Sequence, residues 1–264
     1  MRKFTVIVLC LSIFVLYACN QTKISNLKIM TYNIRHGEGL DGVQDLSRAA
    51  EIIKAQAPDL CGLQEIDNYC LRSDSVGQTD YLAQKTNMTG TFCKFINFQG
   101  GEYGMATLSA KPLISTKLLK LPDGVQEPRS SIIHEVQIAE GCTLVFVNVH
   151  LDWIESDEGV ASRLNQTKVL MQYIDSINKP VIITGDFNCT PDSPTMKYFE
   201  KHGFEFVNKG ADNLSFQGTT KVEIDHVIFR STKEVKIKAK SINLLEEPVV
   251  SDHRPLVAQL EIVY

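Results

Sequence analysis

Gly185-Asp186-Phe187-Asn188 follows directly on the apolar run 181–184, and three other short polar motifs also adjoin apolar runs. Apolar runs of this length, bounded by turn residues, predict buried strands. A single four-residue motif carries little weight, because such matches occur by chance. Several in a fixed order indicate that strand ends gather carboxylate, carboxamide and imidazole groups into one polar site. The other three motifs are Thr31-Tyr32-Asn33-Ile34, Leu63-Gln64-Glu65-Ile66 and Ser251-Asp252-His253-Arg254-Pro255.

Strand and helix patterns alternate along the chain. Helices are expected at residues 45–56, 80–87, 158–176 and 194–201, and strands fill most of the intervals from residue 27 to residue 263. This alternation predicts an α/β fold in which two packed, largely antiparallel mixed sheets are flanked by helices, a four-layer α/β/β/α sandwich. The apolar spacing of the longest helix predicts an inner face formed by Val160, Leu164, Val169, Leu170, Tyr173 and Ile174.

The N-terminus has the pattern of a targeting segment. Arg2 and Lys3 precede the apolar residues 4–16, a stretch too short to span a bilayer comfortably. Leu16-Tyr17-Ala18-Cys19 resembles the cleavage site of bacterial lipoproteins. We therefore expect a signal peptide over residues 1–18, a lipid on Cys19, a tether over residues 19–26 and one domain over residues 27–264. The alternative is an ordinary secretory signal that leaves Cys19 a free thiol.

A lipid on Cys19 would place the protein in the bacterial cell envelope, anchored to a membrane and facing the periplasm or the cell exterior. Without Arg2 and Lys3, the formal net charge of −4 becomes −6. This acidity disfavours a nucleic-acid partner without excluding one. The odd set of cysteines beyond Cys19 lacks a zinc-binding spacing, and we expect these residues in the core.

Oxygen ligands dominate the four motifs. Carboxylate and amide oxygens favour Mg²⁺, Mn²⁺ or Ca²⁺ over zinc. Asp186 and Asn188 lie two residues apart, so both point to one side of an extended backbone. A tight turn is the alternative for this motif alone, since Gly, Asp and Asn are turn residues. The oxygen-bearing residues are Asn33, Glu65, Asp186, Asn188 and Asp252.

Two histidines, His150 and His253, adjoin apolar runs and stand beside acids. An imidazole in that position can donate to a phosphoryl oxygen or transfer protons. Asp225 is a candidate to hold one of these rings in its orientation. The neighbouring His226 should face the opposite side of its strand and pack, and His134 should be structural.

Together these motifs make residues 27–264 resemble the endonuclease/exonuclease/phosphatase superfamily, which includes deoxyribonuclease I, bacterial sphingomyelinases and inositol-polyphosphate 5-phosphatases. The resemblance implies a four-layer sandwich and Mg²⁺-dependent cleavage of phosphoester bonds. It implies that Glu65 is the principal metal ligand, supported by Asn33 and Asp252. It also implies that Asp186 orients or deprotonates water and that Asn188 holds the phosphate. His253, paired with Asp225, would contact the phosphate, and His150 would lie near the phosphate or the leaving group.

Two departures from the family pattern stand out. Met105 follows Gly104 where many relatives have Asn, and Arg35 stands where repair nucleases have an acid. Arg35 could bind a second phosphate or a carboxylate of the substrate, or form an ion pair on the rim. Arg129 is a second candidate for a phosphate clamp. Trp153 could contact an apolar or sugar moiety, or simply pack.

These observations favour a Mg²⁺- or Mn²⁺-dependent phosphodiesterase or phosphatase acting on a small or lipid-derived phosphoester near the membrane. An extracellular DNA or RNA nuclease is the alternative. It is disfavoured by the net charge and by four acids within residues 152–158, which would repel a polyanion if they border the site. A binding module without catalysis is less favoured, because every motif residue is present. We expect a monomer.

Overall fold

The structure is a computed structural model that describes residues 22–264. The predicted signal peptide, the predicted lipid attachment point Cys19 and the first part of the expected tether lie outside these residues. Within residues 22–264, no helix has the length and apolar character needed to cross a membrane.

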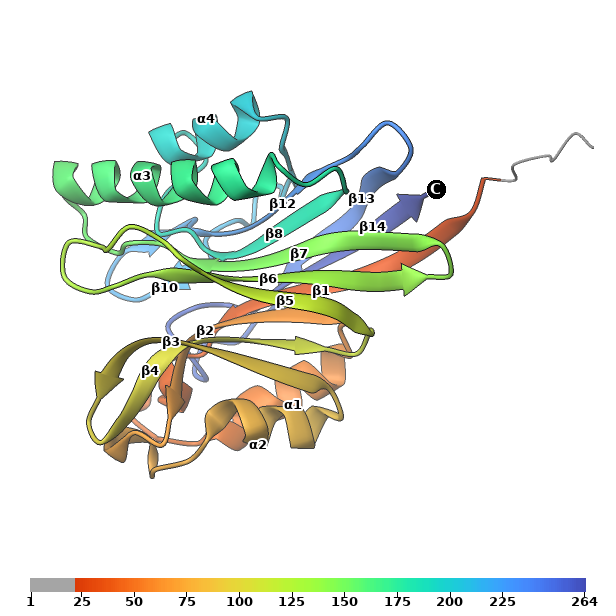
Figure 1. Cartoon of the computed structure of the whole chain (residues 1–264). Coiled ribbons are helices and arrows are strands. Elements are labelled where there is room, and N and C mark those ends of the chain that lie inside the picture. Colours follow the sequence, from red (N-terminus) through yellow and green to blue (C-terminus); the bar gives the residue numbers. More distant parts are fainter. Residues whose placement is uncertain (1–21) are drawn as a thin grey trace, which may run out of the picture.

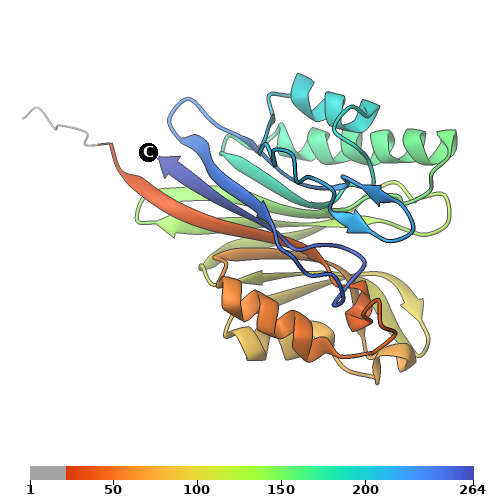
Figure 2. The same ribbon diagram turned by 180° about the vertical axis from the view of Figure 1, so that it is seen from behind.

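Two six-stranded sheets pack face to face and helices cover their outer faces, so the predicted four-layer sandwich is confirmed (Figures 1 and 2). The first sheet has the order β13-β14-β1-β2-β4-β3. Its strands are β1 (Ile24–Asn33), β2 (Leu60–Asn68), β3 (Thr89–Phe98), β4 (Gly101–Ser109), β13 (Lys236–Leu244) and β14 (Leu256–Val263). Outside this sheet lie α1 (Leu46–Gln56) and α2 (Gln78–Thr86). Short 3-10 turns, η1 (Arg35–Gly37) and η2 (Leu71–Ser73), follow β1 and β2.

The second sheet has the order β5-β6-β7-β8-β12-β9. Its strands are β5 (Leu113–Lys120), β6 (Ser130–Ala139), β7 (Cys142–His150), β8 (Val181–Asp186), β9 (Glu205–Phe206) and β12 (Asp225–Arg230). Its outer face is covered by α3 (Asp157–Ile174) and α4 (Pro194–Lys201). A separate two-stranded sheet joins β10 (Phe216–Gln217) to β11 (Lys221–Val222). The two-residue strands β9 and β10 were not predicted, because they are too short to show a periodic pattern.

Each large sheet contains one parallel strand pair, β1 with β2 and β7 with β8. A helix makes the crossover in each case, α1 in the first sheet and α3 in the second. Because both strands of a parallel pair end at the same sheet edge, their final residues become neighbours. His150 is accordingly the register partner of Asp186. The sheet pairing thus brings together polar residues that are far apart in the sequence.

The core has three apolar layers, one between the sheets and one beneath each pair of helices. Strand residues alternate between these layers because successive side chains point to opposite faces. On β7, Leu144 and Phe146 face the other sheet, whereas Val145 and Val147 pack under the helices. The inter-sheet face of β7 therefore continues through Asn148 to His150. The five cysteines among residues 22–264 are buried and unpaired, as predicted for core residues.

A polar clamp closes the space between the sheets at the middle of β2, next to Glu65. Gln64 Nε2 donates to Asn148 Oδ1 at 2.6 Å. Asn148 Nδ2 in turn donates to the backbone oxygens of Leu63 at 3.1 Å and Ala106 at 2.8 Å. All of these groups are buried, so each hydrogen bond replaces one to water. The clamp fixes the spacing of the sheets where the site begins.

The predicted inner face of the long helix is correct only in its second half. Leu170 and Ile174 are buried as predicted, but Val160 and Leu164 are only partly buried. In the first half, α3 instead buries polar side chains, among them Arg163 and Gln166. These residues make hydrogen bonds to the loop after β7, which the apolar pattern does not record.

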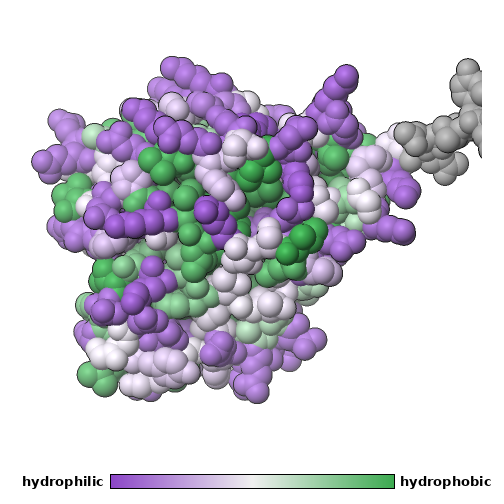
Figure 3. All heavy atoms as spheres, in the orientation of Figure 1, coloured by the Kyte–Doolittle hydropathy of each residue, from purple (hydrophilic) through white to green (hydrophobic). Residues whose placement is uncertain are grey.

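Lysines protect the edge strands of both sheets. β13 carries Lys236, Lys238 and Lys240, and β5 carries Lys117 and Lys120. Charged side chains on an edge discourage pairing with another sheet. Apolar and hydrophilic residues are interspersed on the face seen in Figure 3. The Lys-rich stretch therefore has a structural explanation and does not require a nucleic-acid partner.

His134 links the two sheets at a position away from the predicted site. Its Nε2 lies 2.6 Å from Thr107 Oγ1 of the first sheet, and its Nδ1 lies 2.8 Å from Thr116 Oγ1 of the second. Burial lowers the pKa of His134 from 6.5 to about 4. The ring is neutral at pH 7, as expected for a structural histidine.

We expect the protein to lose stability as the pH falls from 6.5 towards 4, because unfolded His134 takes up a proton there and folded His134 does not. The part of this loss due to His134 should reach about 3 kcal/mol in the free energy of unfolding, and it should be absent above pH about 7. Comparing unfolding midpoints of wild type and His134→Gln across this pH range would measure the contribution of His134. His202→Gln is the control, since His202 is a partly exposed histidine paired with Asp175. Equal pH dependence in wild type and His134→Gln would contradict the prediction.

Candidate functional site

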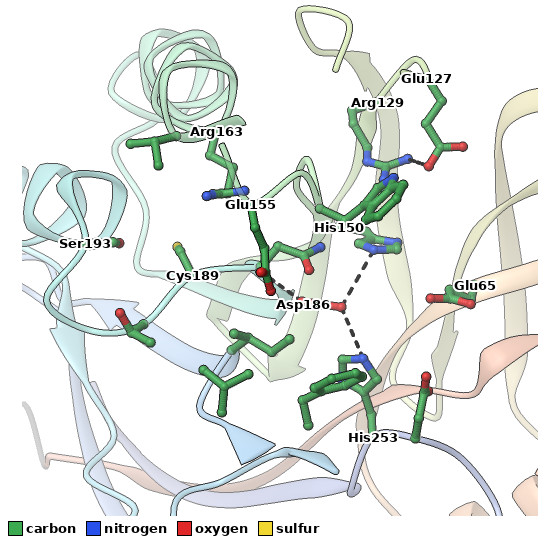
Figure 4. Close-up of a pocket in the computed structure, with 18 of the residues that line it drawn as sticks. Glu65, Glu127, Arg129, His150, Glu155, Arg163, Asp186, Cys189, Ser193 and His253 are labelled. Atoms are coloured by element: carbon green, nitrogen blue, oxygen red, sulfur yellow. Dashed lines mark hydrogen bonds and ion pairs between the residues drawn. The ribbon is translucent and has the colours of Figure 1, made fainter. Parts of the chain in front are cut away.

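All four motifs meet at the end of the sheets opposite Lys23 and Tyr264, where they border a cavity of about 630 Å³. The predicted residues that line the cavity are Glu65, Arg129, His150, Trp153, Asp186, Asn188, Asp252 and His253 (Figure 4). Asn33 and Asp225 are buried beneath this lining and reach it through hydrogen bonds. The volume is in the range of small-ligand pockets.

Strand alternation explains why these side chains converge. Asp186 is on the same face of β8 as the inter-sheet residue Ile182, and Asp225 is on the same face of β12 as Val227. His226 points to the other face and packs against Phe187, as predicted. Its Nε2 lies 2.9 Å from the backbone oxygen of Cys189. The functional groups therefore lie where the inter-sheet core reaches the surface.

Glu65 is aimed at the cavity by an irregular backbone. The pairing of β2 with β4 slips between Leu63 and Ile66, and Glu65 has a φ of 55°. A left-handed conformation is uncommon for a residue other than glycine and often occurs at functional sites. Burial, and then the negative charge of Asp252, raise the pKa of Glu65 above its usual range. Two carboxylates sharing a partly buried site are stabilised by a cation between them.

Asn33 orients this carboxylate. Its Nδ2 donates to Glu65 Oε1 at 3.1 Å and to Asp186 Oδ2 at 3.2 Å. Its oxygen accepts a hydrogen bond from the backbone N–H of Arg35 at 3.1 Å. The oxygens that face the cavity on this side are therefore those of Glu65 and Asp252, whose side chains are about one quarter exposed. These hard donors fit Mg²⁺ or Mn²⁺.

Asp225, His253 and Asp186 form a second, more deeply buried group. His253 Nδ1 lies 2.8 Å from Asp225 Oδ2, and His253 Nε2 lies 3.6 Å from Asp186 Oδ2. Ligand atoms of all three lie within 4.8 Å of one another, close enough to hold a metal ion. Because Nδ1 is already bonded to a carboxylate, we interpret the group as an oriented imidazole beside a base.

The protonation states support this interpretation. Burial alone would lower the pKa of His253, but the carboxylates of Asp225 and Asp186 outweigh it and raise the value to about 10. Burial raises the pKa of Asp186 to about 7, although the His253 cation opposes the shift. At neutral pH the site thus holds an imidazolium next to a carboxylate that can gain or lose a proton.

The Gly185-Asp186-Phe187-Asn188 motif is both a tight turn and part of the site. Gly185 has a φ of 148° and Asn188 a φ of 51°, so the chain bends sharply after β8. Asn188 donates its backbone N–H to Asp186 Oδ1 at 2.9 Å. Its Nδ2 donates to the backbone oxygen of Leu151 at 3.0 Å. Both predicted side chains line the cavity, through the turn rather than through an extended strand.

His150 and Arg129 form the wall opposite His253. His150 Nε2 lies 3.7 Å from Asp186 Oδ2. Burial, and then the charge of Arg129, lower the pKa of His150 well below its usual range, so the ring is neutral. Arg129 is only 1% exposed, and its Nη1 pairs with Glu127 Oε1 at 2.6 Å. Arg129 Nη2 and His150 Nδ1 are buried without a hydrogen-bond partner among the described residues.

Arg35 does not line the cavity. Its Nη2 lies 3.5 Å from Glu38 Oε1, and its Nε lies 3.8 Å from Asp252 Oδ2. It therefore forms the rim ion pair that the sequence left open as an alternative. Trp153 does line the cavity and is 48% exposed, so its ring is available to a ligand. Met105 is fully buried beside Cys93 and Phe95, so it has a role in the core.

The expected acidic screen after His150 is mostly wrong. Asp152 is buried, with Oδ2 accepting from Val125 N at 2.7 Å and Oδ1 from Ile154 N at 3.1 Å. Asp157 and Glu158 lie in the first turn of α3, where they complement the helix dipole. Of the four acids, only Glu155 lines the cavity. Local hydrogen bonding accounts for Asp152, and the helix dipole accounts for Asp157 and Glu158.

Sequence reasoning missed several residues that support or line the site. Ser251 Oγ donates to the backbone oxygen of Asn33 at 2.7 Å and accepts from His253 N at 3.2 Å. It thereby joins the first and last motifs. Arg163 lines the cavity from α3. Its only sequence signal was its position, seven residues before the buried Leu170 on the same helical face.

A family model described as the endonuclease/exonuclease/phosphatase family matches residues 30–253. A UPF0294 protein of Vibrio campbellii is 28% identical over 133 residues, which cover 49% of this chain and 44% of that protein. The match thus spans less than half the length of that relative. A mannosyl-6-phosphatase of Bacteroides thetaiotaomicron has a similar structure, with a TM-score of 0.68, 19% identity and coverage of 90% of this chain and 100% of that one. The structure of D. rerio TDP2 complexed with a single-strand DNA product is also similar, with a TM-score of 0.71 and 18% identity. The match covers 89% of this chain and 99% of that one.

We expect Gly185→Ala to destabilise the fold by more than about 3 kcal/mol, since the added Cβ would lie 2.0 Å from the backbone oxygen of Val149. The matched control is Gly141→Ala, where φ is 76° and no atom lies within 4 Å of the new Cβ. That change should cost only about 1 kcal/mol for the backbone conformation. Unfolding curves of the two variants measure the difference. Equal losses would show that close packing of β8 on β7 does not constrain the turn.

Proposed function

The chain belongs to the endonuclease/exonuclease/phosphatase family of phosphoester hydrolases, and on that premise we propose that it cleaves a small phosphoester by metal-assisted attack of water. One observation carries the proposal. A buried carboxylate, Asp186, lies beside the His253–Asp225 pair and across one cavity from the oxygens of Glu65 and Asp252, and burial raises its pKa.

In the proposed reaction, Glu65 and Asp252 would hold a Mg²⁺ or Mn²⁺ ion. The ion would supply Lewis-acid polarisation of a phosphoryl oxygen. Asp186, kept in place by Asn33 and by the backbone of Asn188, orients the attacking water and accepts its proton. His253 donates from Nε2 to a phosphoryl oxygen and so stabilises charge developing on phosphorus. Asp225 keeps the ring oriented and charged through Nδ1.

The other wall of the cavity would hold the rest of the phosphoester. Asn188 lies next to Asp186 and can contact the phosphate. His150 is neutral, and its Nε2 lies 3.7 Å from Asp186 Oδ2, so it can hydrogen bond to the phosphate or to the leaving-group oxygen. Arg129 has an unpartnered N–H group in the same wall and can pair with a negative oxygen.

The place where the chain enters the domain favours a soluble substrate over a bilayer lipid. Lys23 and Tyr264 exchange two backbone hydrogen bonds at one end of the molecule. The site lies at the other end of β1, about 30 Å away for a strand of 10 residues (Figures 1 and 2). A lipid on Cys19, which we propose from the sequence, would be joined to Lys23 by a segment reaching at most about 14 Å. The cavity would then lie at the end of the domain far from the membrane that holds the anchor.

We expect chelators to abolish hydrolysis and Mg²⁺ or Mn²⁺ to restore it. Glu65→Gln should weaken metal binding at least about tenfold, because it removes one of two carboxylates from the cation site. Calorimetric metal titration and initial rates would measure both effects. Glu102→Gln is the control, since Glu102 is a carboxylate at the start of β4 that pairs with Lys94 outside the cavity. Undiminished hydrolysis in excess chelator would rule out the metal-assisted mechanism.

We expect the protein to hydrolyse soluble phosphomonoesters or phosphodiesters faster than DNA, RNA or phospholipid vesicles. The panel should include 4-nitrophenyl phosphate, bis(4-nitrophenyl) phosphate and sugar phosphates, with phosphate or alcohol release as the readout. Asp186→Asn should lower turnover on the true substrate by about 10²- to 10⁴-fold, the usual effect of losing a general base. Nucleic acid as the best substrate would support the nuclease alternative, and vesicles as the best substrate would contradict the orientation argument.

A further inference from the structure

The cavity is longer than a phosphoryl site needs to be, and its second end is formed by other elements. That end is bordered by α3, by the loop after β8 and by the start of α4 (Figure 4). Its lining residues are Val160, Arg163, Cys189, Thr190, Ser193 and Ile224. Glu155 projects between this end and Asp186 (Figure 4). A substrate that filled the cavity would therefore place a second group beside α3 and α4.

Arg163 is the charged group at this end. Its side chain is 5% exposed, and its Nη1 donates to the backbone oxygens of Asp152 at 2.8 Å and Ile154 at 2.9 Å. Within residues 22–264, no acid forms an ion pair with it, and its Nε and Nη2 make no protein hydrogen bond. Buried charges in proteins are normally paired. A guanidinium with free N–H groups and no counter-ion, bordering a cavity, points to an anionic ligand.

The neighbouring elements add to the positive potential. Ser193 caps α4 and accepts a hydrogen bond from Met196 N at 3.2 Å, so the N-terminus of the helix faces this end of the cavity. Helix N-termini carry partial positive charge and favour anions. Cys189 does not compete, because burial raises the pKa of its thiol to about 11.

We propose that this end of the cavity, built on Arg163, binds a second anionic group of the substrate, a carboxylate or a phosphate. The planar guanidinium matches both groups with two parallel hydrogen bonds. Glu155 between the two ends favours hydroxyl groups on the connecting part and disfavours a continuous polyanion. This inference rests on the proposed function for the identity of the first group. It narrows the substrate to a compact phosphoester with two anionic ends.

The test uses three phosphonates that cannot be hydrolysed and differ only at the far end: 4-hydroxybutylphosphonate, 5-phosphonopentanoate and butane-1,4-bisphosphonate. Binding to the protein in the presence of Mg²⁺ is measured by calorimetry. We expect the two ligands with an anionic far end to bind at least about tenfold more tightly than the hydroxyl ligand. The tighter of the two identifies carboxylate or phosphate as the natural group. Equal binding of all three by wild type would overturn the proposal.

Arg163→Met should remove this preference, and Arg163→Lys should retain part of it. The control is Lys168→Met, an exposed cation on the same helix, which should leave the preference unchanged. Because Arg163 also supports the loop after β7, a purely structural role would weaken all three ligands alike in Arg163→Met. That result would also overturn the proposal.

A second pair of variants keeps the test decisive if Arg163→Met does not fold. Val160 borders the same end of the cavity from the first turn of α3. Val160→Glu should abolish the preference for an anionic far end, because the new carboxylate repels it. Val160→Gln introduces a side chain of the same shape as Glu without the charge and should keep the preference. If both variants lose the preference, or if both keep it, the subsite is contradicted. If the protein prefers the ligands with an anionic far end but hydrolyses no phosphoester, only the proposed function is refuted. If it hydrolyses a phosphoester but shows no such preference, only the subsite is refuted.

Discussion

The space between the two sheets is apolar along most of its length and gathers charged side chains at one end, and the rest of the site depends on this change. Residues of β7, β8 and β12 that face the opposite sheet are apolar in the core. Their polar counterparts at the strand ends are His150, Asp186 and Asp225. The alternation of side chains along each strand decides which face of the sheet a residue occupies. The parallel strand pairs bring the strand ends to the same edge of the sheet. Side chains from distant parts of the sequence therefore converge without a long loop.

Concentrating carboxylates at the end of an apolar layer has electrostatic consequences. Asp225 is balanced by the His253 cation at 2.8 Å, and this pair lies next to Asp186. Glu65 and Asp252 are not balanced in the same way. Arg35 lies 3.8 Å from Asp252, and Glu65 receives only a neutral amide hydrogen from Asn33. The site therefore divides into a half that supplies its own cation and a half suited to an external one.

Backbone strain at the site is held by the surrounding structure. Glu65 and Asn188 have positive φ; Glu65 lies within β2 and Asn188 just after β8, and buried contacts fix the position of both strands. The Gln64–Asn148 clamp holds the residue before Glu65, and close packing on Val149 holds Gly185. Such conformations persist only where neighbours over-determine them. The polar face of α3 likewise holds the loop after β7 in place at the cavity wall, since Gln166 Oε1 accepts a hydrogen bond from Asp152 N at 3.0 Å.

The sequence by itself determined the layer architecture, most strand and helix positions, and the groups at the strand ends, because these follow from local periodicity and strand-end chemistry. It also identified His226 as a packing residue from its position next to Asp225. Only the tertiary structure decided that Arg35 lies on the rim, that Asp152 is a buried hydrogen-bond hub and that Arg163 faces the cavity. Each of these outcomes depends on partners distant in the sequence. A polar residue on a helix or loop shows the same local pattern whether it meets solvent or a buried carbonyl, and packing alone distinguishes the two.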